Sequence, residues 1–216
     1  MRALSEAVIF KDKFEILDFN IVDYFGIPKF EGEVVDFFYG LDFGWVHPTA
    51  IIETFRYNGC LYITNEIVGK EMDIDDITIR FRDEMPYGHL RNIYADAARP
   101  DLIDALANNR LSKYGNELPR MNIEPAKKGA GSVEAGITRL KTHKKIYIHP
   151  KCVNTINNFK KYSYKKDKSD IITTAVLKID DDCIDALRYA YTPLIGEDTT
   201  GIVWTDEDIK ELNLPL

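Results

Sequence analysis

The stretch Val34-Val-Asp-Phe-Phe-Tyr39-Gly-Leu-Asp42-Phe-Gly44 decides the fold of this chain. Its β-branched and aromatic residues predict a strand over Val34–Asp42 that ends at a carboxylate. A second apolar run, Ile93-Tyr-Ala, ends at Asp96, and a late helix opens with Asp180-Asp-Asp-Cys-Ile-Asp185. Carboxylate oxygens gathered by a central sheet are the ligands that hard divalent cations require. The pattern therefore indicates metal-assisted phosphoryl chemistry.

The residues that follow this strand predict a hairpin and then a regular alternation of elements. Strands are expected over 50–57 and 60–67, joined by Asn58-Gly59, because both turn positions tolerate positive φ. Asp73 is expected to cap a helix that runs to about Met85, and Pro100 to begin a second helix.

The second half of the chain continues the alternation. The expected elements are a strand over 121–124, a helix capped by Ser132, a strand over 145–149, a helix opened by Pro150, a hairpin or protruding arm over 170–179 and the final helix after Asp180. An antiparallel start followed by alternating strands and helices predicts an α/β fold with a mixed central sheet flanked by helices.

Three segments are expected along the chain. Residues 1–32 form a leading segment or linker that packs on the domain and is interrupted by Gly26-Ile-Pro28. Residues 33–195 form one catalytic domain, and residues 196–216 form an acidic tail. A chain of 216 residues is long enough for one large core.

The composition is that of a globular protein, with 45% hydrophobic and 29% charged residues. No apolar run approaches the roughly 18 residues of a membrane span, and the N-terminus lacks the apolar core of a signal peptide. The three cysteines (Cys60, Cys152 and Cys183) are widely spaced and lie outside any Cys-x-x-Cys pattern. They predict reduced thiols in a cytosolic setting and no zinc site.

The charge is unevenly distributed. The net charge is −7, yet residues 127–168, here called the basic belt, carry twelve Lys or Arg against Glu134 and Asp167. The belt is therefore +10 and the remainder −17. A basic belt beside an acidic cluster fits a phosphate backbone that approaches metal-binding carboxylates, although a solvated basic face is the alternative. The candidate DNA contacts are Lys127, Lys128, Lys160, Lys161, Lys165 and Lys166.

Four motifs in this order resemble the C-terminal nuclease domain of the large terminase subunit of tailed bacteriophages, over about residues 34–192. They are Gly40-Leu-Asp-Phe-Gly44 with Pro48-Thr-Ala50, Tyr94-Ala-Asp-Ala97, Lys128-Gly-Ala-Gly-Ser132 with Gly136-Ile137, and Ile184-Asp-Ala-Leu-Arg-Tyr-Ala190. The resemblance implies a ribonuclease H-like fold. It also implies endonucleolytic cleavage of concatemeric double-stranded DNA during viral genome packaging, in the cytoplasm of the infected bacterial host, with two Mg²⁺ or Mn²⁺ ions.

The resemblance also assigns roles to the carboxylates. It implies that Asp42 bridges both ions, while Asp96 and Asp185 each complete one ligand shell. Many members of the family carry a histidine at the position of Asp182. Asp181 and Asp182 are thus either accessory metal ligands or first-turn carboxylates favoured by the helix dipole.

The family's ATPase motor carries a GxxxxGK[ST] phosphate loop, and this sequence contains no such pattern. The expectation is an isolated nuclease domain, or the product of a split gene, that does not translocate DNA by itself. The partners implied are double-stranded DNA, the ATPase motor domain, the small terminase subunit and the portal protein, with no membrane. A branched-DNA resolvase of the same fold and a non-catalytic module that docks on portal or capsid remain as alternatives. An actin-like ATPase would need a second glycine-rich phosphate turn, which the sequence lacks.

Overall fold

The structure, a computed structural model, describes residues 5–127, 129 and 131–191, apart from the side chain of Leu90. A seven-stranded sheet forms its centre. In spatial order its strands are β1 (Phe14–Ile16), β12 (Ile146–Ile148), β7 (Cys60–Gly69), β6 (Thr49–Tyr57), β5 (Phe37–Asp42), β8 (Ile93–Ala95) and β11 (Ile123–Pro125). Strand β6 is antiparallel to both of its neighbours, and the other pairs are parallel. The mixed sheet predicted from the sequence is confirmed.

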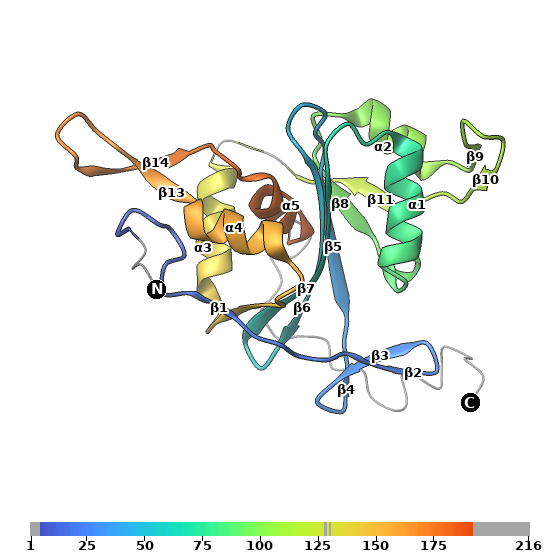
Figure 1. Cartoon of the computed structure of the whole chain (residues 1–216), viewed down its shortest axis with the longest axis horizontal. Helices are drawn as coiled ribbons and strands as arrows, with labels where there is room; N and C mark the ends of the chain where they lie inside the picture. Colours follow the sequence, from blue (N-terminus) through green and yellow to red (C-terminus); the bar gives the residue numbers. More distant parts are fainter. Residues whose placement is uncertain (1–4, 128, 130, 192–216) are drawn as a thin grey trace.

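Helices cover both faces of this sheet (Figure 1). Helices α3 (Ser132–Thr142), α4 (Val153–Lys161) and α5 (Asp182–Ala190) lie on one face, and α1 (Ile74–Glu84) and α2 (Pro100–Ala107) lie on the other. Each face has its own hydrophobic core. Alternation along β6 separates the cores, because Ala50 and Ile52 belong to the α5 side while Ile51 belongs to the α1 side. None of the helices in the described part of the chain is long and apolar enough to cross a bilayer.

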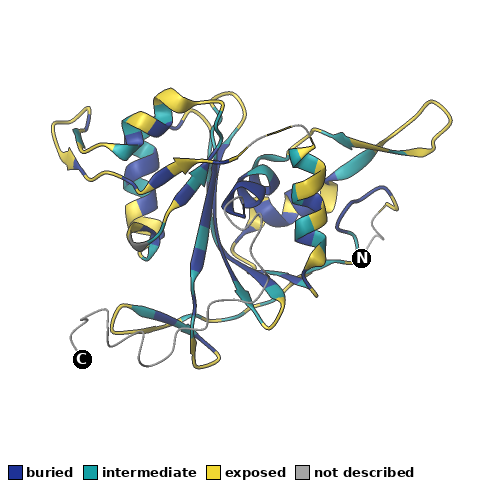
Figure 2. Ribbon diagram, turned by 180° about the vertical axis from the view of Figure 1, so that it is seen from behind, coloured by how far each residue is buried: buried dark blue, intermediate teal, exposed yellow. Residues whose placement is uncertain are grey.

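Smaller strands lie outside the central sheet. They are β2 (Val22–Tyr24), β3 (Ile27–Phe30) and β4 (Glu33–Val34) in one small sheet, the pair β9 (Arg110–Leu111) and β10 (Glu117–Leu118), and the pair β13 (Ser163–Lys166) and β14 (Ile172–Leu177). A short 3₁₀ turn, η1 (Gly88–Leu90), follows α1. The β13–β14 hairpin projects from the body as an arm whose far end is exposed (Figure 2), as the sequence predicted for this region.

Two of the predicted helix starts are wrong, and both errors have a local cause. Ser132 is not the cap of α3: the cap residue is Gly131, whose φ of 78° is readily adopted only by glycine. Pro150 does not open α4, because the N–H of Cys152 donates to the carbonyl of His149 and the helix begins only at Val153. The leading segment also contributes β1, an edge strand of the central sheet that the sequence did not predict.

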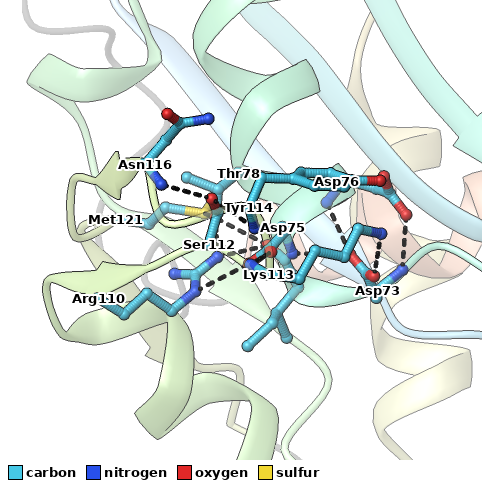
Figure 3. Close-up of polar contacts among 11 residues, drawn as sticks. Asp73, Asp75, Asp76, Thr78, Arg110, Ser112, Lys113, Tyr114, Asn116 and Met121 are labelled. Carbon is cyan, nitrogen blue, oxygen red and sulfur yellow. Dashed lines mark hydrogen bonds and ion pairs between the residues drawn. The ribbon is translucent and has the colours of Figure 1, made fainter.

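The start of α1 agrees with the prediction and is joined to β9–β10 by polar contacts (Figure 3). The Asp73 side chain accepts from the N–H groups of Asp75 and Asp76, both at 2.9 Å. Asp75 in turn accepts from the N–H of Lys113 at 2.7 Å, and the Lys113 ammonium reaches Asp73 at 2.8 Å. The guanidinium of Arg110 approaches Asp75 at 3.5 Å. These contacts hold the β9–β10 pair against the first turn of the helix.

Candidate metal centre

Two of the predicted ligands lie at neighbouring strand ends. Strands β5 and β8 are parallel, and Leu41 pairs with Ala95. The next residues along the chain are Asp42, the last residue of β5, and Asp96. The N–H of Asp96 donates to the carbonyl of Leu41 at 2.9 Å, so the pairing continues to the point where the two carboxylates emerge. The register of one strand pair thus places Asp42 beside Asp96.

Asp96 also shapes the turn that follows it. One of its carboxylate oxygens accepts a hydrogen bond from the N–H of Ala98 at 2.7 Å. This is the ordinary behaviour of an aspartate in a turn. The residue is only half-buried and lies at the carboxyl end of β8. Its role in the turn therefore fixes the position of the carboxylate at the edge where Asp42 also ends.

The third candidate arrives on α5 because β5 has a glycine at the crossing. A Cβ atom at Gly40 would lie 1.8 Å from the carbonyl oxygen of Ala186 and 2.7 Å from the nitrogen of Ala190. Only a residue without a side chain allows the two backbones to come this close. Asp185 immediately precedes Ala186, so the same contact carries its carboxylate toward the end of β5.

Hydrogen bonds from β7 to α4 and from α4 to α5 fix the position of the beginning of α5. Glu66, on β7, accepts from the N–H groups of Asn154 and Thr155 at 2.8 and 2.7 Å, and so anchors the first turn of α4. From the same helix, the amide oxygen of Asn158 accepts from the N–H of Cys183 at 3.0 Å. The first turn of α5 is thereby fixed relative to the sheet through α4.

The three carboxylates all affect the pKa of one buried side chain, Tyr189. Burial raises the pKa of the Tyr189 hydroxyl above its ordinary value. The negative charges of Asp42, Asp185 and Asp96 raise this pKa further, in that order. Because all three charges act on one hydroxyl, residues separated by more than 140 positions in the sequence share one electrostatic environment. The sequence indicated each carboxylate but gave no signal that Tyr189 lies among them.

The remaining acidic candidates lie in the same first turn of α5. Burial raises the pKa of Asp181, and the negative charge of Asp185 raises it further. The pKa of Asp182 is raised by burial and by the charges of Asp181 and Asp185. Like charges in a partly buried site make the ionised forms costly, and a nearby cation lowers that cost. The first turn of α5 is therefore an environment that favours a bound cation.

Asp185 is the candidate with the strongest ionic contact. The Arg188 guanidinium donates to its Oδ1 oxygen through Nη2 at 2.6 Å and through Nε at 3.2 Å. Arg188 is only 8% exposed, so this is a buried ion pair. Burial disfavours the charged guanidinium, but the charge and the hydrogen bond of Asp185, together with Tyr162 and Tyr189, outweigh this effect, and the pKa of Arg188 is raised.

The donor chemistry of this edge fits a hard divalent cation. Carboxylate oxygens are the ligands that Mg²⁺ and Mn²⁺ prefer, and no soft sulfur ligand is required. Among residues 5–127, 129 and 131–191, however, no three His, Cys, Asp or Glu side chains are close enough to hold a metal ion as they stand. Within the described residues the carboxylates therefore share an electrostatic environment but do not form a closed ligand shell. Their assignment as ligands stays a prediction.

One acidic residue of the central strands is directed away from this edge. Glu53 lies on β6 opposite Tyr39, and the Tyr39 hydroxyl donates to it at 2.9 Å. Both residues face the α1 side of the sheet, whereas Asp42 is two positions from Gly40 and shares its α5 side. Burial raises the pKa of Glu53, whose carboxylate also accepts from Thr64. Glu53 is not part of the aspartate group.

The candidate DNA contacts lie on two parts of the basic belt. Lys127 is exposed just before α3, and Lys128 lies outside the described residues. Lys160 and Lys161 are the last two residues of α4, and Lys165 and Lys166 are the last two of β13. All four side chains are exposed. Lys161 pairs with Asp180 at 2.7 Å and Lys166 with Asp170 at 2.9 Å. The end of α4 leads directly into the arm (Figure 1), so these four exposed lysines lie on consecutive elements on either side of the buried Tyr162.

Comparison with known proteins agrees with this geometry. The family model described as a terminase RNase H-like domain matches residues 48–192. The nuclease domain of the large terminase of bacteriophage SPP1, solved with bound Mn, is 28% identical. It superposes with a TM-score of 0.67, covering 83% of this chain and 96% of that one.

Two further structures share the fold. The large terminase nuclease of phage G20c, solved with bound magnesium, is 17% identical, with a TM-score of 0.51 and coverage of 82% of this chain and 92% of that one. The large terminase of bacteriophage D6E, solved with ATP-γ-S, is 17% identical with a TM-score of 0.61. The alignment covers 88% of this chain but only 46% of the D6E protein. A search of curated proteins returned no match.

The family match covers more than half of the chain, and the fold is the one that the four sequence motifs implied. The chain therefore belongs to the family of ribonuclease H-like nuclease domains of the bacteriophage large terminase.

Proposed function

We propose that this chain is a metal-dependent endonuclease that cleaves concatemeric double-stranded DNA during viral genome packaging. The observation that carries the proposal is the pairing of β5 with β8, which ends at Asp42 and Asp96, together with the close crossing of α5 over Gly40, which brings Asp185 toward the same end of β5. The Mn-bound SPP1 nuclease domain, 28% identical, supports the use of a divalent cation.

The roles of the side chains follow from their positions. Two bound Mg²⁺ or Mn²⁺ ions would supply an activated water and stabilise the departing 3′ oxygen. Asp42, at the end of β5, would be the ligand common to both ions. Asp96, after β8, and Asp185, on α5, would each complete one ligand shell, and Asp181 and Asp182 would add negative charge at the start of α5. The protein supplies geometry and charge, and no side-chain nucleophile is required.

The basic belt supplies the contact with DNA. Lys160, Lys161, Lys165 and Lys166 are exposed, and Lys127 leads into α3. Lysines bind phosphates without reading bases, so the contact is independent of sequence and weakens as salt rises. Lys128 is assigned to the same contact from its place in the sequence.

The biological setting follows from the family. This chain spans 46% of the length of the D6E large terminase. We assign it the nuclease step of an assembly that also contains an ATPase motor domain, a small terminase subunit and a portal protein. The assembly works in the cytoplasm of the infected bacterium.

A plasmid-cleavage assay tests the proposal. The purified chain is incubated with supercoiled DNA and Mn²⁺, Mg²⁺ or EDTA, beside Asp42→Asn and the control Asp101→Asn, whose carboxylate pairs with Arg99 in solvent. Cleavage with either ion, lost in EDTA and in Asp42→Asn but kept in Asp101→Asn, is the expected result. We expect Asp42→Asn to lower the rate by at least about 10³-fold, because metal assistance contributes several kcal/mol to the barrier.

Other outcomes separate the alternatives. Full activity in Asp42→Asn would mean that the metal centre is misassigned. A strong preference for four-way junctions over linear duplexes would identify a resolvase. Binding of Mn²⁺ without cleavage of any DNA would favour a docking module.

A further inference from the structure

The side chain of Arg188 packs against helix α3 at a position that has no side chain of its own. It crosses α3 at Gly136, where an added Cβ atom would lie 2.7 Å from Cδ and 3.0 Å from Cγ of Arg188. Glycine inside a helix reduces helix stability relative to alanine. Here the missing side chain makes room for the arginine stem. Nη1 also makes a long contact of 3.5 Å with the carbonyl of Ser132, at the start of the same helix.

The guanidinium is directed at a single oxygen of Asp185. Both hydrogen bonds, from Nη2 and from Nε, end on Oδ1. Oδ2 receives neither of them, and the side chain of Asp185 is 14% exposed. The pair therefore restrains the carboxylate while its second oxygen is directed elsewhere. Hydrogen bonds of this kind from groups behind a ligand commonly orient it and tune metal affinity.

We propose that Arg188 is a positioning residue, which with Gly136 fixes the Asp185 carboxylate in the orientation that binds a divalent cation. This inference rests on the proposed function, because it assumes that Asp185 is a ligand. Arg188 touches neither the reacting phosphate nor the ion in this arrangement. Its effect passes through Asp185, and α3 becomes part of the support of the metal centre.

The test measures Mn²⁺ affinity directly, by calorimetry and by the electron paramagnetic resonance signal of free Mn²⁺. Arg188→Met keeps the length and packing of the stem and removes the hydrogen bonds, so we expect affinity to fall about 10–100-fold. Gly136→Ala removes no charge but displaces the stem, and we expect a loss of about tenfold. Arg188→Lys keeps the charge with a shorter reach, and we expect an intermediate loss.

The matched control is Arg139→Met. Arg139 also connects α3 with the end of α5, through a hydrogen bond of 3.1 Å to the carbonyl of Tyr191, but that contact does not involve Asp185. Its Mn²⁺ affinity should stay within about twofold of the original chain. The Mn²⁺ concentration for half-maximal plasmid cleavage should rise in Arg188→Met and Gly136→Ala by the same factors as the dissociation constants.

The outcomes separate this inference from the function itself. Unchanged Mn²⁺ affinity in folded Arg188→Met and Gly136→Ala would overturn the positioning role while leaving the nuclease intact. An equal loss in Arg139→Met would also overturn it, because general helix packing would then be the cause. Mn²⁺ binding by the original chain without cleavage would refute the nuclease, and the affinities would still decide the role of Arg188. Absence of Mn²⁺ binding would overturn both. If Arg188→Met fails to fold, Gly136→Ala and Arg188→Lys give the answer.

Discussion

Two helices of this protein begin with a run of aspartates, and the two runs have opposite surroundings. At the start of α1, the Asp73 side chain caps the helix, and the Lys113 ammonium lowers its pKa. At the start of α5, Asp181 makes no side-chain capping bond within the described part of the chain, and burial raises its pKa. The lowered pKa of Asp73 reflects a cationic partner that is already present, the Lys113 ammonium. A carboxylate with a raised pKa is placed where a cation would stabilise it.

The surroundings of the two runs distinguish them where the sequence does not. Asp73-Ile-Asp-Asp76 and Asp180-Asp-Asp-Cys-Ile-Asp185 are both acidic first turns, and the helix dipole favours both. Only the surroundings differ, since β9–β10 supplies Lys113 and Arg110 to the first run. In the second run, Lys161 pairs with Asp180 and Arg188 with Asp185. Asp181 and Asp182 lie between them, form no ion pair with any residue that the structure describes, and have pKa values raised by burial and by neighbouring carboxylates.

The largest expected effect is on stability at the α1 run. Asp75→Ala leaves Arg110 buried without its anion, and the two side chains are only 9% and 14% exposed in the intact pair. We expect the free energy of unfolding to fall by about 3 kcal/mol, measured by urea denaturation. The control Asp101→Ala, at an exposed pair, should change it by less than about 0.5 kcal/mol. Cleavage below the melting temperature should be unchanged, and a loss of cleavage in folded Asp75→Ala would break the comparison.

The next effect is stabilisation by metal. Mn²⁺ at 100 times its dissociation constant should raise the free energy of unfolding by about 2.7 kcal/mol, because the ion binds the folded state alone. EDTA should reverse this gain, and Asp42→Asn should abolish it. Asp75→Ala should keep the full increment despite its lower baseline. Thermal melting with and without Mn²⁺ measures this gain in stability for the original chain, Asp42→Asn and Asp75→Ala. An undiminished gain in Asp42→Asn would mean that the ion binds at a site that does not include Asp42.

A smaller effect concerns pH in the absence of metal. The pKa values of Asp181 and Asp182 are raised in the folded state, so the folded protein binds more protons near these values than the unfolded chain does. Stability from these groups is therefore fully present below the unfolded pKa, about 3.9, and is lost as the pH rises through the folded values. The double variant Asp181→Asn, Asp182→Asn should gain about 0.5–1 kcal/mol at pH 7.

The pH dependence of that gain distinguishes the cause. It should shrink as the pH falls toward 4, because the original aspartates then become protonated in the folded state. Asp73 should behave oppositely, since its pKa is lowered and its contribution is lost as the pH falls below about 3.9. Urea midpoints measured from about pH 2.5 to about pH 7 cover both dependences. A constant gain across this range would point to capping by asparagine, without a role for charge.

The smallest effect is at Lys113. The ion pair between Lys113 and Asp73 is 46% and 37% exposed, so solvent screens most of its energy. We expect Lys113→Gln to lower the free energy of unfolding by about 0.3 kcal/mol, with less effect at high salt. Matched urea curves at low and high salt measure it. A loss above about 1 kcal/mol would mean that the ammonium holds the β9–β10 pair in place.

Local signals in the sequence were sufficient for much of this fold. The Asp73 cap, the Asn58-Gly59 turn and a strand that ends at Asp42 each depend on neighbouring residues, and all three are present in the structure. The strand is shorter than predicted, because β5 begins at Phe37 and Val34 belongs to β4 in the small sheet. The cap of α3 was assigned to Ser132 because hydroxyls are common there, whereas Gly131 reaches the necessary backbone angle more easily. Short-range chemistry was thus readable, with errors of a few residues at helix starts.

The rest depends on contacts between distant residues. Strand β1 has only three residues and forms because β12 offers it an edge more than 130 positions later. Three further features are also tertiary interactions between distant residues. They are the effect of the three aspartates on the pKa of Tyr189, the hydrogen bond from Cys183 to Asn158, and the close contact of Arg188 with Gly136. A sequence identifies carboxylates that could bind metal, but it does not show which oxygen each one presents or which side chain orients it.

The crossing of β5 and α5 at Gly40 has a consequence for how such a nuclease can vary. The distance between Asp42 and Asp185 depends on the absence of a side chain at Gly40, because a Cβ atom there would lie 1.8 Å from the carbonyl oxygen of Ala186. Replacing Gly40 by alanine would therefore push α5 away from β5 and separate the candidate ligands Asp42 and Asp185, although both carboxylates would remain. Glycine is therefore required at this crossing, and a residue with no functional group is as necessary to the arrangement as the aspartates that it brings toward one another.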